Sequence, residues 1–447
     1  MKTVKAAAVI PIVSLLMVSA LQVTRAAFVA SDPGVRGGPA GAGGRLPGLT
    51  TSQRAFFAAS RTEFEGVENP EEGLGPRFNL DSCVGCHSQP ASGGSSPFVN
   101  PQVAVATALG ATNTVPSFIT VDGPVREARF KTTPNGSADG GVHSLFVVTG
   151  RSDAPGCDAV QEDFEAEVTA HNIIFRIPTP TFGAGLIEMI PDRAIEANRQ
   201  ANGSDRAAFG ISGRANHNGN DGTIARFGWK AQNKSLLVFA GEAYNVEMGI
   251  TNDNFQTERD ENPNCQFAPG PNSVTDTDST TPPTVISAIE QFGIFMRFLA
   301  PPTPSASMPG GSASIAAGAQ TFNDIGCALC HTPSFRTRDT TIGALANQPV
   351  NLFSDLLVHN MGPGLADDVS QGQARGDEFR SAPLWGLGKR IFFLHDGRTT
   401  DLIQAIREHR SAANATYRAS EANVSVNMFG GLSEPEKQNL LNFLRSL

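Results

Sequence analysis

The pentapeptide Cys83-Val84-Gly85-Cys86-His87 occurs a second time as Cys327-Ala328-Leu329-Cys330-His331. In each copy the two thiols lie one helical turn apart, so both can reach the vinyl groups of one haem, and the next residue can offer its imidazole to the iron. A disulfide pair, a four-thiol zinc site or a thioredoxin-like motif could also use two such cysteines, but none of them needs histidine after both pairs. We therefore expect two covalently bound c-type haems. Their thioether sites would be Cys83, Cys86, Cys327 and Cys330, and their iron ligands His87 and His331.

The first residues have the features of an export signal. Lys2 and Lys5 precede an apolar run over residues 6–23, and small residues follow, so we expect cleavage near Ala26. A retained signal is the alternative, because the run is nearly long enough to span a bilayer, and it would leave the protein associated with the membrane. Haem attachment of this kind takes place outside the cytoplasm, so the motifs and the signal both predict a periplasmic protein.

Composition indicates a folded protein of more than one domain. The chain has 447 residues, of which 40% are hydrophobic, and its 46 Gly and 30 Pro imply many turns. The formal net charge is -9, and loss of Lys2, Lys5 and Arg25 with the signal would make it -12. This charge disfavours nucleic acid as a partner and fits a basic redox protein or a small electron donor. After the signal, no stretch is apolar enough to cross a membrane.

The order of turn-rich and apolar segments predicts a mainly α protein with extensive loops and short β segments. It would hold two cytochrome c-like haem domains, the first enlarged by insertions. The expected boundaries are a signal peptide at 1–26, a flexible lead-in at 27–48, an N-terminal haem domain at 49–299, a linker at 300–314 and a C-terminal haem domain at 315–447.

Apolar spacing and caps predict a helix before each haem motif and another at the end of the chain. Thr50 and Gln53 form a capping box before the first, and Ser433 and Glu436 form one before the last. Further helices are expected at 285–299 and 315–325. Short strands or loops are expected at 144–148, 173–177 and 236–239.

Two cysteines remain outside the haem motifs, Cys157 and Cys265. In an oxidising compartment an even pair of this kind favours a disulfide, with two free thiols as the alternative.

Several further segments make the sequence similar to a known family. They read GLGP (73–76), GGSSP (93–97), RIPTP (176–180), FGAGLIE (182–188), RFGWK (226–230), SDLL (354–357), PLWGLG (383–388) and LHDGR (394–398). With the two haem motifs, they resemble the bacterial di-haem oxidoreductases of peroxidase type, some of which are labelled thiol oxidoreductases. The resemblance spans nearly the whole mature chain. It extends, more distantly, to the bacterial di-haem cytochrome c peroxidases.

The resemblance also implies a sixth ligand for the C-terminal haem. In the cytochrome c peroxidases that ligand lies on the helix after a His-Asp-Gly motif, which here is His395-Asp396-Gly397, and the matching position falls on or near His409. Met361 is the competing ligand, because single-domain cytochromes c often use methionine. The ligation of each iron decides which haem transfers electrons and which reacts.

For the N-terminal haem we expect an open or weakly occupied sixth site, although His143 and His171 are available. An open iron is what peroxide chemistry needs. Glu188, at the end of a Gly-rich loop, is the candidate general acid/base.

Four further residues have candidate roles. Arg176 and Arg226 could pair with haem propionates or lie at the surface. Trp229 and Trp385 could relay electrons between the haems or pack in the core.

Together these features predict a periplasmic di-haem oxidoreductase. It would pass electrons between two covalently bound haems and reduce peroxide or a related oxidant. One alternative is a non-catalytic electron carrier, in which both irons are six-coordinate. Another is a haem enzyme that acts on an organic or thiol substrate.

Overall fold

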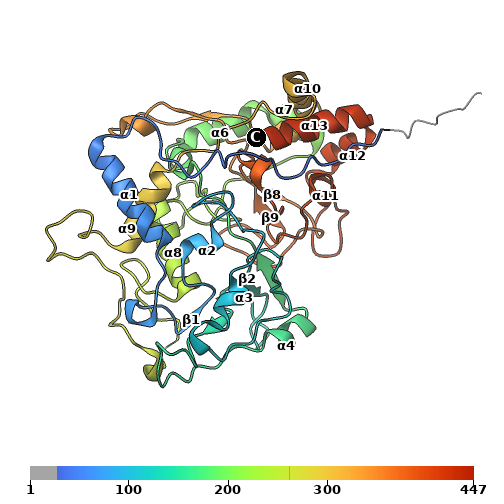
Figure 1. Cartoon of the computed structure of the whole chain (residues 1–447). Coiled ribbons are helices and arrows are strands. Elements are labelled where there is room, and N and C mark those ends of the chain that lie inside the picture. The colour runs from blue at the N-terminus through green and yellow to red at the C-terminus, as the bar shows by residue number, and fades with distance from the viewer. Residues whose placement is uncertain (1–27, 261) are drawn as a thin grey trace, which may run out of the picture.

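The computed structural model describes residues 28–260 and 262–447, so the expected export signal at 1–26 lies outside it. Helices and loops dominate, and the strands are short (Figure 1). This part of the chain has no helix that is both long and apolar enough for a membrane span. The helices are α1 (Thr51–Glu65), α2 (Cys83–Cys86), α3 (Gln102–Val105), α4 (Phe164–Thr169), α5 (Ala184–Glu188), α6 (Asp192–Ala201), α7 (Gly203–Phe209), α8 (Leu236–Met248), α9 (Ala288–Phe298), α10 (Gly311–Asp324), α11 (Leu402–Glu408), α12 (Asn423–Gly431) and α13 (Glu434–Ser446).

The strands form four small antiparallel sheets within the described residues. The largest has the order β3-β2-β5, and the others are the pairs β1-β4, β6-β7 and β8-β9. Two of the expected segments are confirmed as strands, β4 and β5. The strands are β1 (Arg77–Phe78), β2 (Glu127–Phe130), β3 (Val142–His143), β4 (Phe146–Val147), β5 (Ile173–Arg176), β6 (Phe335–Arg336), β7 (Pro349–Val350), β8 (Val358–Asn360) and β9 (Glu378–Arg380).

Helices α1, α8 and α9 pack together beside the first motif (Figure 1). The Thr50 capping box starts α1 as expected, and the buried face of this helix carries Phe57 and Phe64. Both rings contact Phe295 of α9, with centroids 5.5 Å and 4.6 Å away. Aromatic packing of this kind fixes α1 against α9.

Helices α10 and α13 cross beside the second motif (Figure 1). A Cβ on Gly318 would lie 2.0 Å from the Asn439 carbonyl oxygen, so only glycine allows this close approach. Phe322 packs against Phe443 with ring centroids 5.4 Å apart. The expected helices at 315–325 and at the end of the chain are thereby confirmed.

The strand or loop expected at 236–239 is wrong, because these residues begin α8. The Ser235 hydroxyl accepts a hydrogen bond from the Val238 N–H and caps the helix, which ends at Gly249 in a left-handed conformation. Both faces of α8 contain buried apolar residues. A continuous apolar run therefore belonged to a buried helix rather than to a strand.

Residues 28–48, expected to be a flexible lead-in, form an extended strap along α13 (Figure 1). Asp32 accepts two hydrogen bonds from the buried Arg445 guanidinium, both at 2.7 Å. Lys389 donates to the carbonyl oxygens of Gly37 and Gly38. A Gly- and Pro-rich sequence without periodicity can thus be held by backbone carbonyls and one ion pair, which composition does not reveal.

The largest hydrophobic core extends across the expected linker. It contains Phe57 and Phe295 from one side and Leu345, Leu352 and Leu357 from the other. A second core surrounds α10 and α13. The division into haem domains at 300–314 stays a prediction.

Candidate functional site

The first motif forms the single helical turn α2, with His87 at its C-cap. A Cβ on Gly85 would lie 2.1 Å from Leu80 Cδ2, so local packing requires glycine inside the motif. The free thiols of Cys83 and Cys86 and the His87 ring line one cavity, called the first cavity below. Its volume, counted to its open mouth, is about 1160 Å³.

The second motif forms a 3₁₀ turn, Cys327–Leu329, after Gly326 in a left-handed conformation (φ 81°). The free thiols of Cys327 and Cys330 and the His331 ring line the second cavity, of about 1420 Å³. Each motif therefore brings two thiols and one imidazole to a cavity of its own.

Three histidines are oriented in the same way. Nδ1 of His87 donates to Gly94 O (2.9 Å), Nδ1 of His331 to Phe353 O (3.1 Å) and Nδ1 of His409 to Ala405 O (2.7 Å). A carbonyl oxygen only accepts, so Nε2 of each ring is left unprotonated. Burial lowers the pKa of all three, that of His331 to about 4, which keeps the rings neutral. Neutral histidine with its other nitrogen bonded to a carbonyl suits an iron ligand.

These groups fit two c-type haems. The four thiols are unpaired, each motif supplies one oriented imidazole, and both cavities are lined mainly by apolar side chains. A tetrapyrrole with two vinyl groups needs this combination of two thiols, an axial nitrogen and an apolar pocket.

The second cavity offers more than one further ligand. His409, at the C-cap of α11, and Met361 both line it, as do His359 and His395. The oriented Nε2 favours His409 over Met361. The ring of His395 stacks on Phe379 at 4.3 Å.

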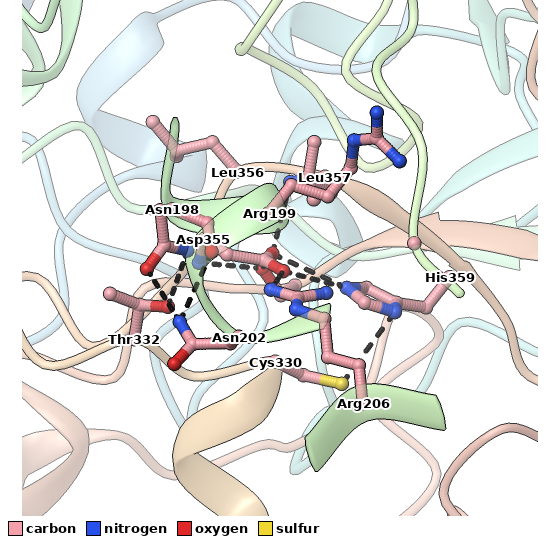
Figure 2. Close-up of polar contacts among 12 residues, drawn as sticks. Asn198, Arg199, Asn202, Arg206, Cys330, Thr332, Asp355, Leu356, Leu357 and His359 are labelled. Carbon is pink, nitrogen blue, oxygen red and sulfur yellow. Dashed lines mark hydrogen bonds and ion pairs between the residues drawn. The ribbon is translucent and has the colours of Figure 1, made fainter. Parts of the chain in front are cut away.

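His359 is instead held between two carboxylates, on Asp355 (3.1 Å) and Glu421 (2.9 Å). Figure 2 shows its ring pointing toward Asp355 and the Cys330 sulfur. The Asp355 backbone N–H also donates to Cys330 O, and Arg206 of α7 donates to its carboxylate at 2.7 Å. Both His359 nitrogens are thus engaged, and this cluster anchors the second motif to α7.

The first cavity has a different lining. His87 is its only histidine among the described residues, and the thioethers of Met248 and Met296 also line it. His143 bonds Glu162 and Asp139 through its two nitrogens and lies outside the lining. His171 is exposed. No imidazole other than that of His87 is therefore placed to bind iron here.

Two interacting carboxylates line the first cavity, Glu127 of β2 and Glu247 of α8. Glu247 accepts a hydrogen bond from Asn79 at 2.7 Å, and Glu127 accepts one from Arg129 at 2.6 Å. Burial and the Glu127 charge raise the pKa of Glu247 well above the usual range. Burial also opposes ionisation of Glu127, but the Arg129 charge, the hydrogen bonds from Glu247 and Arg129 and the Arg176 charge together lower the pKa of that carboxyl. In this pair Glu247 is therefore the carboxyl that keeps a proton more readily, and Glu127 is the one that ionises more readily.

Glu188 lies outside the lining of both cavities. Its carboxylate accepts from Arg297 Nε (2.8 Å) and from the Leu236 N–H (2.9 Å), which ties α5 to α8 and α9. Gly183 and Gly185 allow close approach to Trp385 and Arg297, respectively. The acid/base role of Glu188 stays a prediction, and the contacts found here are structural.

The two arginines considered as propionate partners both have carboxylate partners in the protein. Arg176 bonds Asp367 at 2.6 Å and Gln371 at 2.6 Å. Arg226 bonds Asp192. Arg176 also lines the first cavity, whereas Arg226 lines neither cavity, so the pairing of either with a propionate stays a prediction.

Trp229 lines both cavities, and it is the only described residue that does so. Its Nε1 donates to Ile177 O at 2.8 Å, and its ring lies edge-on to His395. Trp385 lines neither cavity; it lies beside Gly183 and lines two smaller pockets, one of which it shares with Trp229.

Sequence reasoning missed Glu127, Glu247, Arg380 and Arg390, all of which line a cavity. A signal for Glu247 was present, because it is one of only two carboxylates, with Glu242, in a largely apolar helical stretch. The other three had no such pattern.

One comparison with protein families gives a match over most of the chain. A family model described as "Di-haem oxidoreductase, putative peroxidase" matches residues 127–447. The search of curated proteins found no match.

Two solved structures are weakly similar to the chain. One is a MauG-like protein associated with microbial copper homeostasis, at 17% identity over 60% of this chain and 90% of that one, with a TM-score of 0.29. The other is hydrazine synthase of Kuenenia stuttgartiensis, at 17% identity and a TM-score of 0.23. That match covers 36% of this chain and 55% of the hydrazine synthase chain.

Proposed function

Because the chain belongs to the di-haem oxidoreductase family, we propose that it holds two covalently attached haems and uses them to reduce peroxide. Electrons would enter at the second cavity, pass by Trp229 and be used at the first cavity. The observation that carries this proposal is the contrast between the cavities. The cavity of the second motif is lined by three further histidines, and that of the first motif is lined by a pair of carboxyl groups, of which Glu247 has a raised pKa.

Attachment of the haems falls to Cys83 and Cys86 in the first cavity and to Cys327 and Cys330 in the second. The unpaired state of all four thiols supports this assignment. His87 and His331 would be the iron ligands on the motif side. Haem iron supplies one-electron chemistry and, where its sixth position is open, can bind an oxidant.

In the first cavity the carboxyl pair would move protons. Reduction of one peroxide to two waters consumes two electrons and two protons. Glu247, whose pKa is raised, would give the first proton, and solvent at the open mouth of the cavity would supply the second. Glu127, which Arg129 keeps ionised, would take up a proton from solvent and pass it to Glu247 after each transfer.

In the second cavity His409 would close the iron to substrate. Its Nε2 is free because Nδ1 donates to Ala405 O. A six-coordinate iron cannot bind peroxide, so this site would only transfer electrons. Trp229 lies between the two linings and would shorten the electron route.

The expected export signal, which would place the protein in the periplasm, fits this activity. Cys157 and Cys265 are joined by a disulfide in the structure, as an oxidising compartment would allow. The acidic net charge fits a basic redox protein or a small molecule as electron donor.

Electron paramagnetic resonance of the mature protein, with both haems attached, tests the proposal. We expect one high-spin and one low-spin iron, and peroxide-dependent oxidation of a reduced donor cytochrome. Two low-spin irons, including one bound by Met248 or Met296, together with no peroxide turnover would instead identify a non-catalytic electron carrier.

A further inference from the structure

Arg380 is unusual among the buried arginines of the described chain. Every other one forms an ion pair with an aspartate or glutamate. Arg380 is 8% exposed, and its side chain bonds only Gly228 O, through Nε at 3.0 Å. A buried guanidinium without a counter-charge is costly to the fold, so a site of this kind calls for an anion.

A second arginine lies close by. Arg390 also lines the second cavity, and its guanidinium has no carboxylate partner in residues 28–260 and 262–447. Burial lowers the pKa of Arg390 to about 10, and burial together with the Arg390 charge lowers that of Arg380 to about 10. Two neighbouring cations therefore face a cavity whose lining supplies only one carboxylate, Glu421, already paired with His359.

The position of the pair indicates which anion it binds. Both arginines line the second cavity, beside the thiols and imidazole of the second motif, and both also line the narrow pocket on its Trp229 side. A c-type haem carries two propionate carboxylates, and a planar guanidinium binds a carboxylate in a two-pronged way. Two arginines and two carboxylates match in number and in charge.

We propose that Arg380 and Arg390 bind the propionates of the haem held by Cys327, Cys330 and His331, an inference that rests on the proposed function. The Arg380 N–H donates to Trp229 O at 2.8 Å. The propionate edge of that haem therefore lies beside Trp229, on the side of the second cavity that faces the first.

The test is the reduction potential of the second haem in the full mature protein. R380Q and R390Q each leave a propionate charge unbalanced, which favours oxidised iron. We expect each to shift the reduction equilibrium by about tenfold, which is about 59 mV for a one-electron couple, toward a lower potential. R380K keeps the charge and should shift less, and R418Q, at an exposed position, should not shift.

Each outcome of this experiment is decisive. Unchanged potentials in both glutamine variants, with the haem still attached, would overturn the propionate assignment. A saturable response of the wild-type potential to added acetate or phosphate, lost in R380Q, would also overturn it, because the site would then be open to free anions. Should R380Q fail to fold, R390Q and R380K provide the same test.

Failure of the proposed function would look different. In that case, mass spectrometry of the wild-type peptide that contains Cys327 and Cys330 would show no haem. No property of the arginine variants is needed to reach that conclusion.

Discussion

The two cavities begin from the same pentapeptide and differ in everything that surrounds it. The first is lined by Glu127, Glu242 and Glu247 but has no histidine besides His87 among the described residues. The second is lined by four histidines and Met361, and by a single carboxylate that is already paired. The same Cys-x-x-Cys-His pattern can thus lie in one cavity that has groups to supply protons and in another that has groups to bind iron. The helices and strands around each motif, rather than the motif itself, therefore determine what each site can do.

H409A should have the largest effect on this contrast between the two cavities, because it removes the histidine proposed as the sixth ligand of the second iron. Removal of the imidazole opens the second iron, so its low-spin signal in electron paramagnetic resonance should be lost and a second high-spin signal should appear. The first haem should be unchanged. Haem attachment should persist, because neither the thiols nor His331 is touched.

M361A is the matched control, since Met361 lines the same cavity. It should keep the low-spin signal. If M361A loses that signal and H409A does not, the methionine is the ligand, and the two sites differ less in ligand supply than proposed.

E247Q addresses the proton supply of the first cavity. Glutamine keeps the shape and can still bond Asn79, but it cannot give up a proton. Peroxide turnover should fall by roughly 10² to 10⁴-fold, the usual contribution of general acid catalysis. In the wild type, turnover should also fall as the pH rises through the raised pKa of Glu247, because only the protonated carboxyl can act as donor. Steady-state kinetics against pH measures both effects, and the alkaline decline should be missing in the variant.

E188Q is the matched carboxyl change outside both cavities. It keeps an oxygen for the Leu236 N–H and weakens the contact with Arg297. A loss of turnover equal to that of E247Q, with normal stability, would return the acid/base role to Glu188 as the sequence predicted.

D32N tests how strongly the strap of residues 28–48 stabilises the helices around the second cavity, against which Arg445 holds it. Breaking one partner of a buried ion pair costs about 3 to 5 kcal/mol of unfolding free energy. Burial raises the pKa of Asp32. The hydrogen bonds and charge of Arg445, with the backbone N–H groups of Gly34 and Leu402, together lower it below the ordinary aspartate value. Its stabilisation is therefore present above the ordinary aspartate pKa and is lost as the pH falls through the lowered value. Denaturant unfolding at several pH values should show this acid dependence in the wild type and a weaker one in D32N.

The exposed pair Asp221 and Lys234 offers a control for D32N. D221N should change stability little, because solvent screens exposed ion pairs. Equal losses of unfolding free energy in D32N and D221N would mean that the buried ion pair of the strap stabilises the protein no more than an exposed ion pair does.

Where an ion pair holds the strap, a covalent bond joins distant segments in the N-terminal half of the chain. The disulfide between Cys157 and Cys265 spans 108 positions. The double variant C157S/C265S should lose about 2 to 4 kcal/mol, chiefly because the unfolded chain gains freedom. Denaturant unfolding would measure the loss, which reducing agent should reproduce in the wild type but not in the variant.

Local signals in the sequence were sufficient for the parts that local interactions determine. The capping boxes at Thr50 and Ser433 start helices as expected, and both haem motifs line cavities. His409 was reached by family resemblance and lies in the second cavity with its Nε2 free. These features depend on neighbours within a few positions, or on motifs that a family shares.

Long-range pairing could not be predicted. Arg176 forms an ion pair with Asp367, which is 191 positions away in the sequence, and no local pattern indicates this partner. Glu127 and Glu247 come from a strand and a helix that the fold brings together, and neither segment carries a recognisable motif. The failure at residues 236–239 has another cause. Four apolar residues suit a strand or a buried helix equally, and tertiary packing decides between them.

The strap contact between Asp32 and Arg445 has a consequence for biosynthesis. These partners are 413 positions apart, so the end of the strap around Asp32 lacks this ion pair until the last helix has been made, although Gly41, Gly44 and Leu46 can already bond residues 298–303. A chain interrupted before Arg445 leaves its beginning open to proteases, whereas a completed chain covers it. This contact is therefore present only in finished molecules and is missing from fragments, even from fragments that already carry both haem motifs.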